Sequence, residues 1–297
     1  MNKRQKHFMK ESKVERLFSA LNVFLLLLLA AATLFPFLHV LAQSLSSETA
    51  VISGQVGLFP VDPQLGTYQY VMGNSQFTSS FRVSVIITVL GTLGAMVVTT
   101  FGAYTLSKPH LPGRNFFLVL FIFAMLFHGG IIPNYLLMRS LGLLDSIWVL
   151  ILPALVNVFN LLIIKNFFEG TPESLEEAAR IDGANTFSIL FRIVLPISLP
   201  VLATISLFYA VAYWNDFFRA MIYISRPDLK PLQLYLYEIV TQTQRPLTDV
   251  PVDSAMNLTP AAVRSATIMA TTFPILVVYP FLQKYFVKGI VVGSVKG

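Results

Sequence analysis

Long stretches of apolar side chains constrain this chain more than any other feature. A helix that crosses a membrane needs about 20 mostly apolar residues. The stretches that meet this length lie at about 17–42, 81–106, 116–138, 147–168, 200–224 and 262–286. Backbone polar groups in lipid must be paired within the protein, and segments this long and uniformly apolar indicate helices rather than the alternating strands of a barrel. We therefore expect an all-α membrane protein with six transmembrane helices.

Composition excludes a soluble helical protein. The chain is 55% hydrophobic and 12% charged, with a mean hydropathy of +0.68, whereas soluble domains carry about 25% charged residues. A cleaved signal peptide is the alternative for the first stretch. Its basic leader, residues 1–16, and its apolar run are both longer than is usual for a signal peptide. We expect residues 1–16 to form a cytoplasmic tail and residues 17–297 to form the membrane domain.

The distribution of positive charge predicts the orientation, because lysine and arginine favour cytoplasmic loops. About two thirds of the 21 lysines and arginines fall on one side of the six predicted spans. That side carries Lys3, Arg4, Lys6, Lys10, Lys13, Arg16, Lys108, Arg114, Lys165, Arg180, Arg192, Lys284, Lys288 and Lys296. Both termini are therefore expected in the cytoplasm. The same distribution argues against nucleic-acid binding, despite a net charge of +6.

Two long segments are predicted on the outer side, at about 43–80 and 225–261. They are rich in Pro, Gly, Ser, Thr and Gln and show little periodicity. Long loops often carry function, so we expect these two to cap a pore or to meet an external partner.

Motifs for chemistry are missing from the sequence. There is no cysteine, and the four histidines have no metal-ligand spacing. No GxxxxGK[ST] phosphate-binding loop occurs either. We expect no catalytic residue, no metal and no cofactor in this chain, and any use of ATP would then depend on another chain.

The predicted cytoplasmic connection 171–196 looks like a well-delimited short helix. Thr171 is expected to cap it, Pro172 suits its first position, and acidic residues follow in the first turns. Leu175, Ala178 and Ala179 would share one face, and Gly183 suits the end of the helix.

A second amphipathic stretch follows this helix, with one predicted face formed by Phe187, Leu190, Phe191 and Val194. By spacing alone, segment 171–196 could dock on a soluble partner or lie on the membrane surface.

Specific residues in this connection decide between these alternatives. Glu177-Ala178-Ala179, Gly183, Ile193 and Leu195-Pro196 reproduce the spacing EAA-x3-G-x9-I-x-LP. This pattern is similar to the signature of permease subunits of ABC importers. The resemblance implies a type I importer permease fold in which segment 171–196 is the coupling loop that docks on an ATP-hydrolysing subunit. The residues it implicates in coupling are Glu177, Ala178, Ala179, Asp182, Gly183, Ala184, Leu195 and Pro196.

Further segments resemble the carbohydrate-type, maltose-importer-like permeases. They are Gly102–Tyr104, Leu111–Arg114, Leu141–Asp145, Trp214–Asp216, Lys288–Gly289 and Val295–Gly297. Gly129–Pro133 resembles a branch that imports oligosaccharides derived from plant or algal polysaccharides.

This resemblance implies partners and a location. We expect a second, homologous permease subunit, two ATP-binding cassette subunits that bind ATP and Mg, an extracellular solute-binding protein and surrounding lipid. The location would be a bacterial plasma membrane, crossed several times. A permease for a peptide or amino acid is the nearest alternative, and a stand-alone channel or intramembrane enzyme is a more distant one.

Polar residues inside the spans are candidates for a substrate path, because such residues are costly in lipid and often functional. Asn157 and Asn160 are expected to share a face of the fourth span, and Tyr209, Tyr213 and Asp216 to form a stripe with Ser206 on the fifth; Asn215 is a further candidate. Tyrosine and amide groups suit a sugar. The alternative is that they hold helices together, and Trp214–Asp216 could instead anchor a helix at the outer interface. Arg82, Arg219 and Arg264 are expected to extend to the interface from span ends. Gly91 and Gly94 are expected to allow close packing, and Gly129, Gly130 and Pro133 to break the third span.

Overall fold

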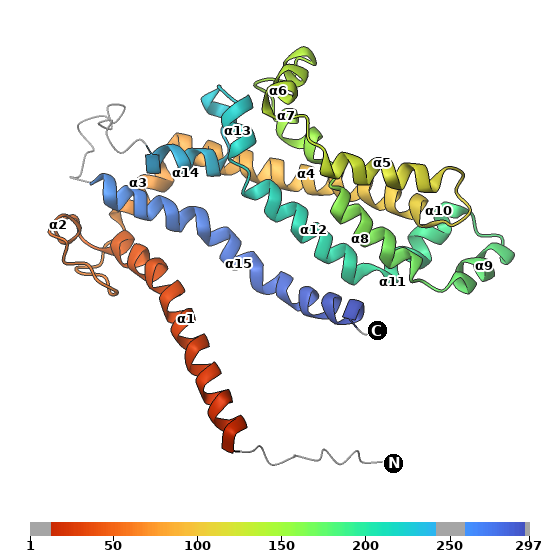
Figure 1. Ribbon diagram of the computed structural model, residues 1–297. Coiled ribbons are helices and arrows are strands. Elements are labelled where there is room, and N and C mark those ends of the chain that lie inside the picture. The colour runs from red at the N-terminus through yellow and green to blue at the C-terminus, as the bar shows by residue number, and fades with distance from the viewer. Residues whose placement is uncertain (1–12, 242–258, 295–297) are drawn as a thin grey trace. The chain divides into compact units, whose positions relative to one another are not determined.

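The computed structural model describes residues 13–241 and 259–294, with side chains as far as Val277. Within these residues the ordered elements are all helical (Figure 1). They are α1 (Lys13–Leu45), α2 (Glu48–Ile52), α3 (Gly66–Gly73), α4 (Ser75–Ser107), α5 (Arg114–Leu126), α6 (Ile131–Ser140), α7 (Trp148–Ile151), η1 (Leu152–Ala154), α8 (Val158–Glu169), α9 (Glu173–Ile181), α10 (Thr186–Ile189), the π-helical turn η2 (Leu190–Val194), α11 (Leu195–Ile197), α12 (Leu199–Trp214), α13 (Phe218–Tyr223), η3 (Pro227–Leu229), α14 (Leu232–Thr241) and α15 (Pro260–Ser294).

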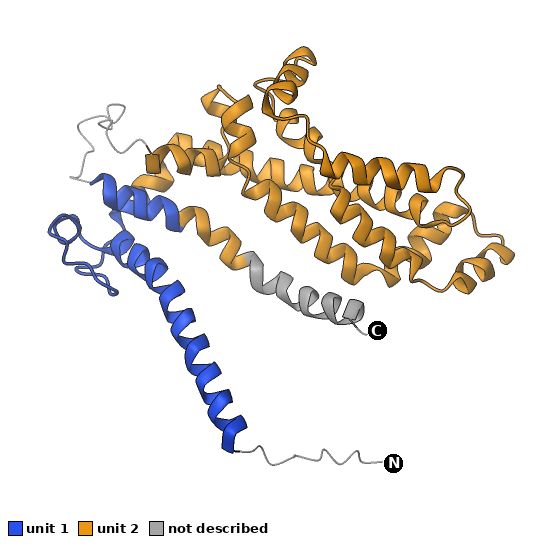
Figure 2. Cartoon of the chain, viewed as in Figure 1, with its two compact units in different colours: residues 1–69, 247–269 blue, residues 70–246, 270–297 orange. Residues whose placement is uncertain are grey.

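The chain divides into two units (Figure 2). Unit 1 comprises residues 1–69 and 247–269, and its main element is α1. The leucines at 25–29 are each more than half exposed, which suits a helix surrounded by lipid. The segment after α1 folds back on it, with the Ser44 hydroxyl 2.8 Å from the Tyr68 hydroxyl and the Gln64 N–H donating to the Leu45 carbonyl. Most of the predicted tail 1–16 lies outside the described residues.

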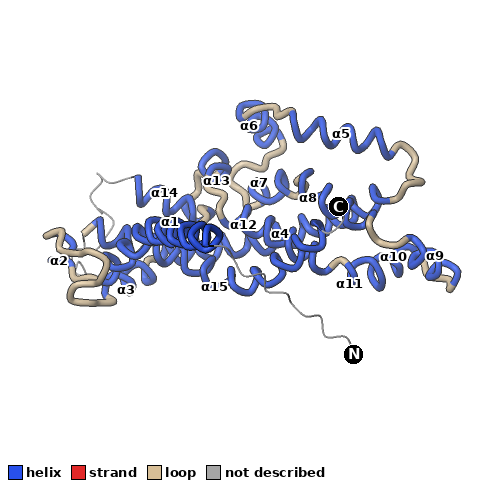
Figure 3. The backbone as a smooth tube through the Cα atoms, turned by 60° about the horizontal axis from the view of Figure 1, so that its bottom comes forward, coloured by secondary structure: helices blue, strands red, loops and turns tan. Residues whose placement is uncertain are grey.

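Unit 2, residues 70–246 and 270–297, contains the main hydrophobic core. Its central element is α4, which packs against α8 and α12. Small residues allow this close approach: Ala95 and Ala103 are completely buried, and Gly102 lies against Leu161 of α8. Helices α9 and α10 lie at one end of unit 2, and α13 and α14 lie toward the other (Figures 1 and 3).

Three of the six predicted spans are broken. Segment 116–138 forms α5 and α6, which meet at 111° around residues 127–130. The predicted break at Gly129 and Gly130 is confirmed: Gly130 has φ +87°, which favours glycine, and α6 begins after it. Segment 147–168 bends by 46° between η1 and α8. The helix in segment 200–224 ends at Trp214, and α13 follows after a three-residue interruption.

Length and composition leave three unbroken helices that could cross a membrane in the described residues: α1, α4 and the Pro260–Val277 part of α15. Three bent pairs would raise the number to six. The two segments predicted on the outer side also contain helices that their lack of periodicity did not indicate. Segment 43–80 contains α2, α3 and the start of α4, and segment 225–261 contains η3 and α14, with residues 242–258 outside the description.

Candidate substrate cavity and coupling surface

A polar cavity lies where η1 gives way to α8. It has a volume of about 390 Å³. The polar side chains that line it are Asn157, Asn160, Tyr209, Tyr213 and Arg219; the others belong to Pro153, Ala154, Val156, Phe159, Phe208 and Ala212. These residues come from the η1–α8 segment, α12 and α13, all within unit 2. The break in segment 147–168 thus places a polar chamber beside otherwise apolar helices.

Tyr209 joins the elements around this cavity. It is 2% exposed, and its hydroxyl lies 2.7 Å from the Thr99 hydroxyl of α4. The same hydroxyl accepts the backbone N–H of Asn157 at 3.1 Å. Asn157 is the N-cap of α8, and its Oδ1 accepts the N–H of Asn160. The spacing predicted that Asn157 and Asn160 share a helix face. This was wrong, because Asn157 precedes the helix.

Tyr213 lies flat against α4 where that helix has no side chain. A Cβ built on Gly91 would stand 2.7 Å from two atoms of the Tyr213 ring. The Tyr213 hydroxyl donates to the Ile151 carbonyl at 3.1 Å, just before the break in the span. The role predicted for Gly91 in close packing is thus confirmed, with Tyr213 as the group it admits.

Arg219 adds charge to the cavity, and the sequence analysis did not assign it there. Its guanidinium lies 6.0 Å from the centre of the Tyr213 ring and 2.5 Å from the Asp216 carboxylate. Asp216 also accepts the N–H of Arg219. Asp216 pairs with this arginine beside the cavity, and the spacing of three residues between them was the available signal. That Arg219 extends to the membrane interface stays a prediction.

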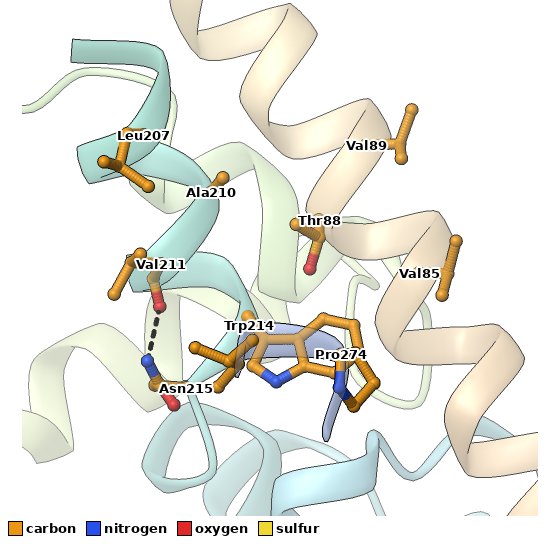
Figure 4. A pocket seen from close by; sticks show the side chains of 10 residues that line it. Val85, Thr88, Val89, Leu207, Ala210, Val211, Trp214, Asn215 and Pro274 are labelled. Atoms are coloured by element: carbon orange, nitrogen blue, oxygen red, sulfur yellow. Dashed lines mark hydrogen bonds between the residues drawn. The ribbon is translucent and has the colours of Figure 1, made fainter. Parts of the chain in front are cut away.

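The six predicted substrate-path residues therefore separate. Asn157, Asn160, Tyr209 and Tyr213 line one cavity, and Asp216 is connected to it through Arg219. Asn215 instead lines an apolar pocket of about 200 Å³ with Trp214, where its amide donates to the Val211 carbonyl of its own helix (Figure 4).

The connection predicted for coupling forms helix α9, with one difference at its start. Pro172 is the N-cap, without a side-chain hydrogen bond, and the Thr171 hydroxyl is buried without a hydrogen-bond partner. The predicted capping by Thr171 was wrong, because the helix begins one residue later than expected. The helix ends as predicted: Gly183 has φ +81°, its N–H donates to the Arg180 carbonyl, and the Ala184 N–H donates to the Ala179 carbonyl.

Side chains of the predicted coupling residues divide between surface and core. Glu177, Ala178, Asp182, Gly183 and Pro196 are exposed. Ala179, Ala184 and Leu195 pack against the core of unit 2. The predicted shared face of Leu175, Ala178 and Ala179 is therefore incomplete, because Ala179 turns inward while Leu175 is 43% exposed.

The second predicted face of this segment also divides. Leu190 and Val194 are buried, whereas Phe187 and Phe191 are 67% and 54% exposed and pack their rings on Phe101 of α4. The π-helical turn at Leu190–Val194 changes the angular spacing that the prediction assumed.

Ion pairs join the loops at this end of unit 2. Arg114 contacts Glu169, which also pairs with Lys165 at 2.8 Å, and Lys108 pairs with Glu176 at 2.5 Å. The basic residues predicted in two separate loops on one side of the membrane thus lie together.

At the opposite end, Asp145 connects two loops. Its carboxylate accepts the N–H groups of Ser225 at 2.5 Å and Arg226 at 3.0 Å, and its own N–H donates to the Tyr223 carbonyl. Arg226 in turn donates two hydrogen bonds to the Asp228 carboxylate, which lowers the pKa of Asp228 below its ordinary value. Among the described residues, no group of three or more His, Asp or Glu side chains could hold a metal ion.

These features define a helical membrane component of a transport system, and the comparisons agree. The chain belongs to the family of binding-protein-dependent transport system inner membrane components, which residues 113–292 match. The predicted resemblance to ABC importer permeases is thus confirmed, and the chain is a transport subunit rather than an enzyme.

Particular relatives resemble it over nearly their whole length. Protein LplC of Bacillus subtilis is 45% identical over 98% of this chain and 99% of its own. The polygalacturonan/rhamnogalacturonan transport system permease protein YtcP of the same organism is 44% identical over 95% and 99%. The crystal structure of a bacterial ABC transporter involved in the import of the acidic polysaccharide alginate contains a chain with 36% identity and a TM-score of 0.87, over 93% of this chain and 99% of that one.

Proposed function

We propose that this permease moves oligosaccharides into a bacterial cell by alternating access. It would work in the plasma membrane with a second, homologous permease, two ATP-binding cassette subunits that hold ATP and Mg, and an extracellular solute-binding protein. The names of the relatives support a sugar polymer as the source of the substrate, since they include polygalacturonan, rhamnogalacturonan and alginate. They do not favour a peptide or amino acid.

The proposed topology has six spans in residues 17–297 and both termini in the cytoplasm. It takes the three unbroken helices as one span each, and it takes Arg114–Leu126 with Ile131–Ser140, and Trp148–Ala154 with Val158–Glu169, as one span each. The sixth span begins with Leu199–Trp214, because the first half of that bent pair, Thr186–Ile197, lies almost entirely in the coupling loop. The grouping of Lys108, Arg114 and Lys165 at one end of unit 2 supports the cytoplasmic assignment of that end.

In the proposed cycle, α9 is the coupling helix. ATP binding brings the two ATPase subunits together, and this helix transmits their motion to the spans. The spans then open the pathway toward the outside, and ATP hydrolysis restores the inward-facing state. The exposure of Glu177, Ala178, Asp182 and Gly183 supports this role, because a docking surface must be free in the isolated chain.

The cavity around Asn157, Asn160, Tyr209 and Tyr213 is the proposed sugar path. One observation supports this assignment above all: four polar residues that the sequence suggested for a substrate path line the same cavity of about 390 Å³. Both tyrosine hydroxyls already have protein partners. We therefore expect the amides of Asn157 and Asn160 to contact sugar hydroxyls and the exposed ring of Phe159 to offer a stacking surface.

The test is uptake into proteoliposomes by the complete complex with its binding protein, using neutral and uronate-containing oligosaccharides. We expect Asn160→Ala to change uptake of at least one sugar and Asn215→Ala to leave it unchanged, because Asn215 lies outside the cavity. Equal uptake by Asn160→Ala and the unmodified protein for every transported sugar would refute the path. If no oligosaccharide in the panel stimulates ATP hydrolysis by the complex, the proposed class of substrate, oligosaccharides, is refuted.

A further inference from the structure

Helix α9 carries two adjacent glutamates in opposite environments. Glu177 belongs to the family signature and is exposed. Glu176 is 7% exposed and faces the interior of unit 2. Consecutive residues of a helix point about 100° apart, so the two carboxylates cannot serve the same neighbour. Glu177 is available to a partner subunit, whereas Glu176 is committed within this chain.

The partner of Glu176 is the end of α4. Lys108 is the C-cap of α4, and its ammonium lies 2.5 Å from both carboxylate oxygens of Glu176. The same ammonium lies 4.2 Å from the centre of the Tyr104 ring, one turn earlier on α4. Arg180 approaches Glu176 from α9 itself at 3.8 Å. The Glu176 side chain is 9% exposed, and without Lys108 only the more distant Arg180 would compensate its charge, which is unfavourable.

A second contact holds the same helices together. The Phe101 ring of α4 meets the rings of Phe187 and Phe191 edge to face, at centroid distances of 6.5 and 6.2 Å. Phe101 and Lys108 lie two turns apart on α4. The segment α9–α10–η2 thus contacts the last turns of α4 at two separate points, although the ion pair joins residues 68 positions apart in sequence.

Helix α4 continues from this contact to the cavity without interruption. It is a single helix from Ser75 to Ser107 that contains no proline. About 13 Å from Lys108 along the helix axis, Thr99 contacts the hydroxyl of Tyr209; about 25 Å away, Gly91 receives the ring of Tyr213. A displacement of the end of α4 would therefore be transmitted to both tyrosines as a movement of one rigid element.

We propose that the Glu176–Lys108 ion pair is the joint through which α9 moves α4, and that α4 transmits this motion to the cavity tyrosines. Glu176 is then a positioning residue for transport, distinct in role from Glu177. This inference rests on the proposed docking of an ATPase subunit on α9.

The first test compares Glu176→Gln with Glu177→Gln in the complete complex. We expect Glu176→Gln to retain the ATPase subunits and their ATP hydrolysis but to lower the sugar transported per ATP by about tenfold. Glu177→Gln should instead reduce ATPase association. Lys108→Met removes the other partner of the ion pair and keeps a side chain of similar length over the Tyr104 ring, so it should lower the ratio in the same way. An unchanged ratio in Glu176→Gln or in Lys108→Met would overturn the proposal.

A second measurement does not depend on any variant of the ion pair. The chain has no cysteine, so nitroxide labels can be placed at single introduced cysteines, Thr105→Cys on α4 and Ser174→Cys on α9, which lies outside the proposed docking residues. Both positions are exposed. The distance between these labels should stay the same with and without ATP, because the two helices move together. A nucleotide-dependent change in that distance would overturn the joint. Failure of the ATPase subunits to co-purify with the unmodified chain would instead refute the proposed docking.

Discussion

The contact between Gly91 and Tyr213 allows a sharp test of the packing around the cavity. Replacing Gly91 with alanine would place a Cβ 2.7 Å from the Tyr213 ring, whereas carbon atoms pack at about 3.5–4.0 Å. The ring must therefore move by about 1 Å. That movement would stretch the hydrogen bond from Tyr213 to the Ile151 carbonyl from 3.1 Å to about 4 Å, which is too long to count as a bond.

The magnitude follows from opposing effects. Overpacking and the loss of a buried hydrogen bond each cost about 1–3 kcal/mol. Alanine is favoured over glycine in a helix by up to about 1 kcal/mol. We expect Gly91→Ala to destabilise the chain by about 2 kcal/mol net, which corresponds to a fall of several degrees in the midpoint of thermal unfolding of the complex in nanodiscs.

Gly102→Ala is the matched control on the same helix. Its Cβ would meet only the flexible end of Leu161 at 3.4 Å, so we expect a midpoint close to that of the unmodified complex. The double variant with Tyr213→Phe, which already lacks the hydrogen bond, should show a smaller effect of Gly91→Ala, by about 1 kcal/mol. Equal midpoints for Gly91→Ala and Gly102→Ala would refute the packing argument.

Three further changes test other contacts. Gly183→Ala places a side chain at φ +81°, which costs about 1–2 kcal/mol locally; less ATPase should co-purify, and unchanged co-purification would contradict its role in shaping the coupling surface. Tyr209→Phe removes the hydroxyl that accepts the Asn157 N–H and should lower the thermal midpoint by an amount equivalent to about 1 kcal/mol; an unchanged midpoint would show that this bond adds no stability. Asp145→Ala removes the acceptor for two N–H groups of loop 224–231 and should speed its cleavage by added protease, while an unchanged rate would mean that other contacts hold the loop.

The breaks in the spans were only partly predictable from the sequence. Gly129 and Gly130 predicted the break between α5 and α6, because Gly130 adopts a left-handed conformation. The break after Ala154 was not predicted. It depends on the Tyr209 and Tyr213 hydroxyls that pair with backbone groups on either side of it, and these tyrosines lie more than 50 residues away in sequence.

Local chemistry in the sequence by itself determined the membrane class, the helical content and the family. Apolar length requires helices in lipid, and the residues Glu177–Ala179, Gly183 and Leu195–Pro196 identify the family through their spacing. Four of the six residues predicted for a substrate path also line one cavity, because polar groups are conspicuous in an apolar span; their contact with substrate stays a prediction.

Only the tertiary structure decided which polar residues meet and which of two neighbouring glutamates turns inward. Arg219 lines the cavity and Asn215 does not. The helix α12 ends at Trp214, so the helical spacing used for the prediction does not continue through residues 215–219. Glu176 becomes buried because Lys108, 68 positions earlier, ends α4 beside it. Such pairings depend on packing between segments far apart in the sequence. The spacing of residues along one helix gives no information about that packing.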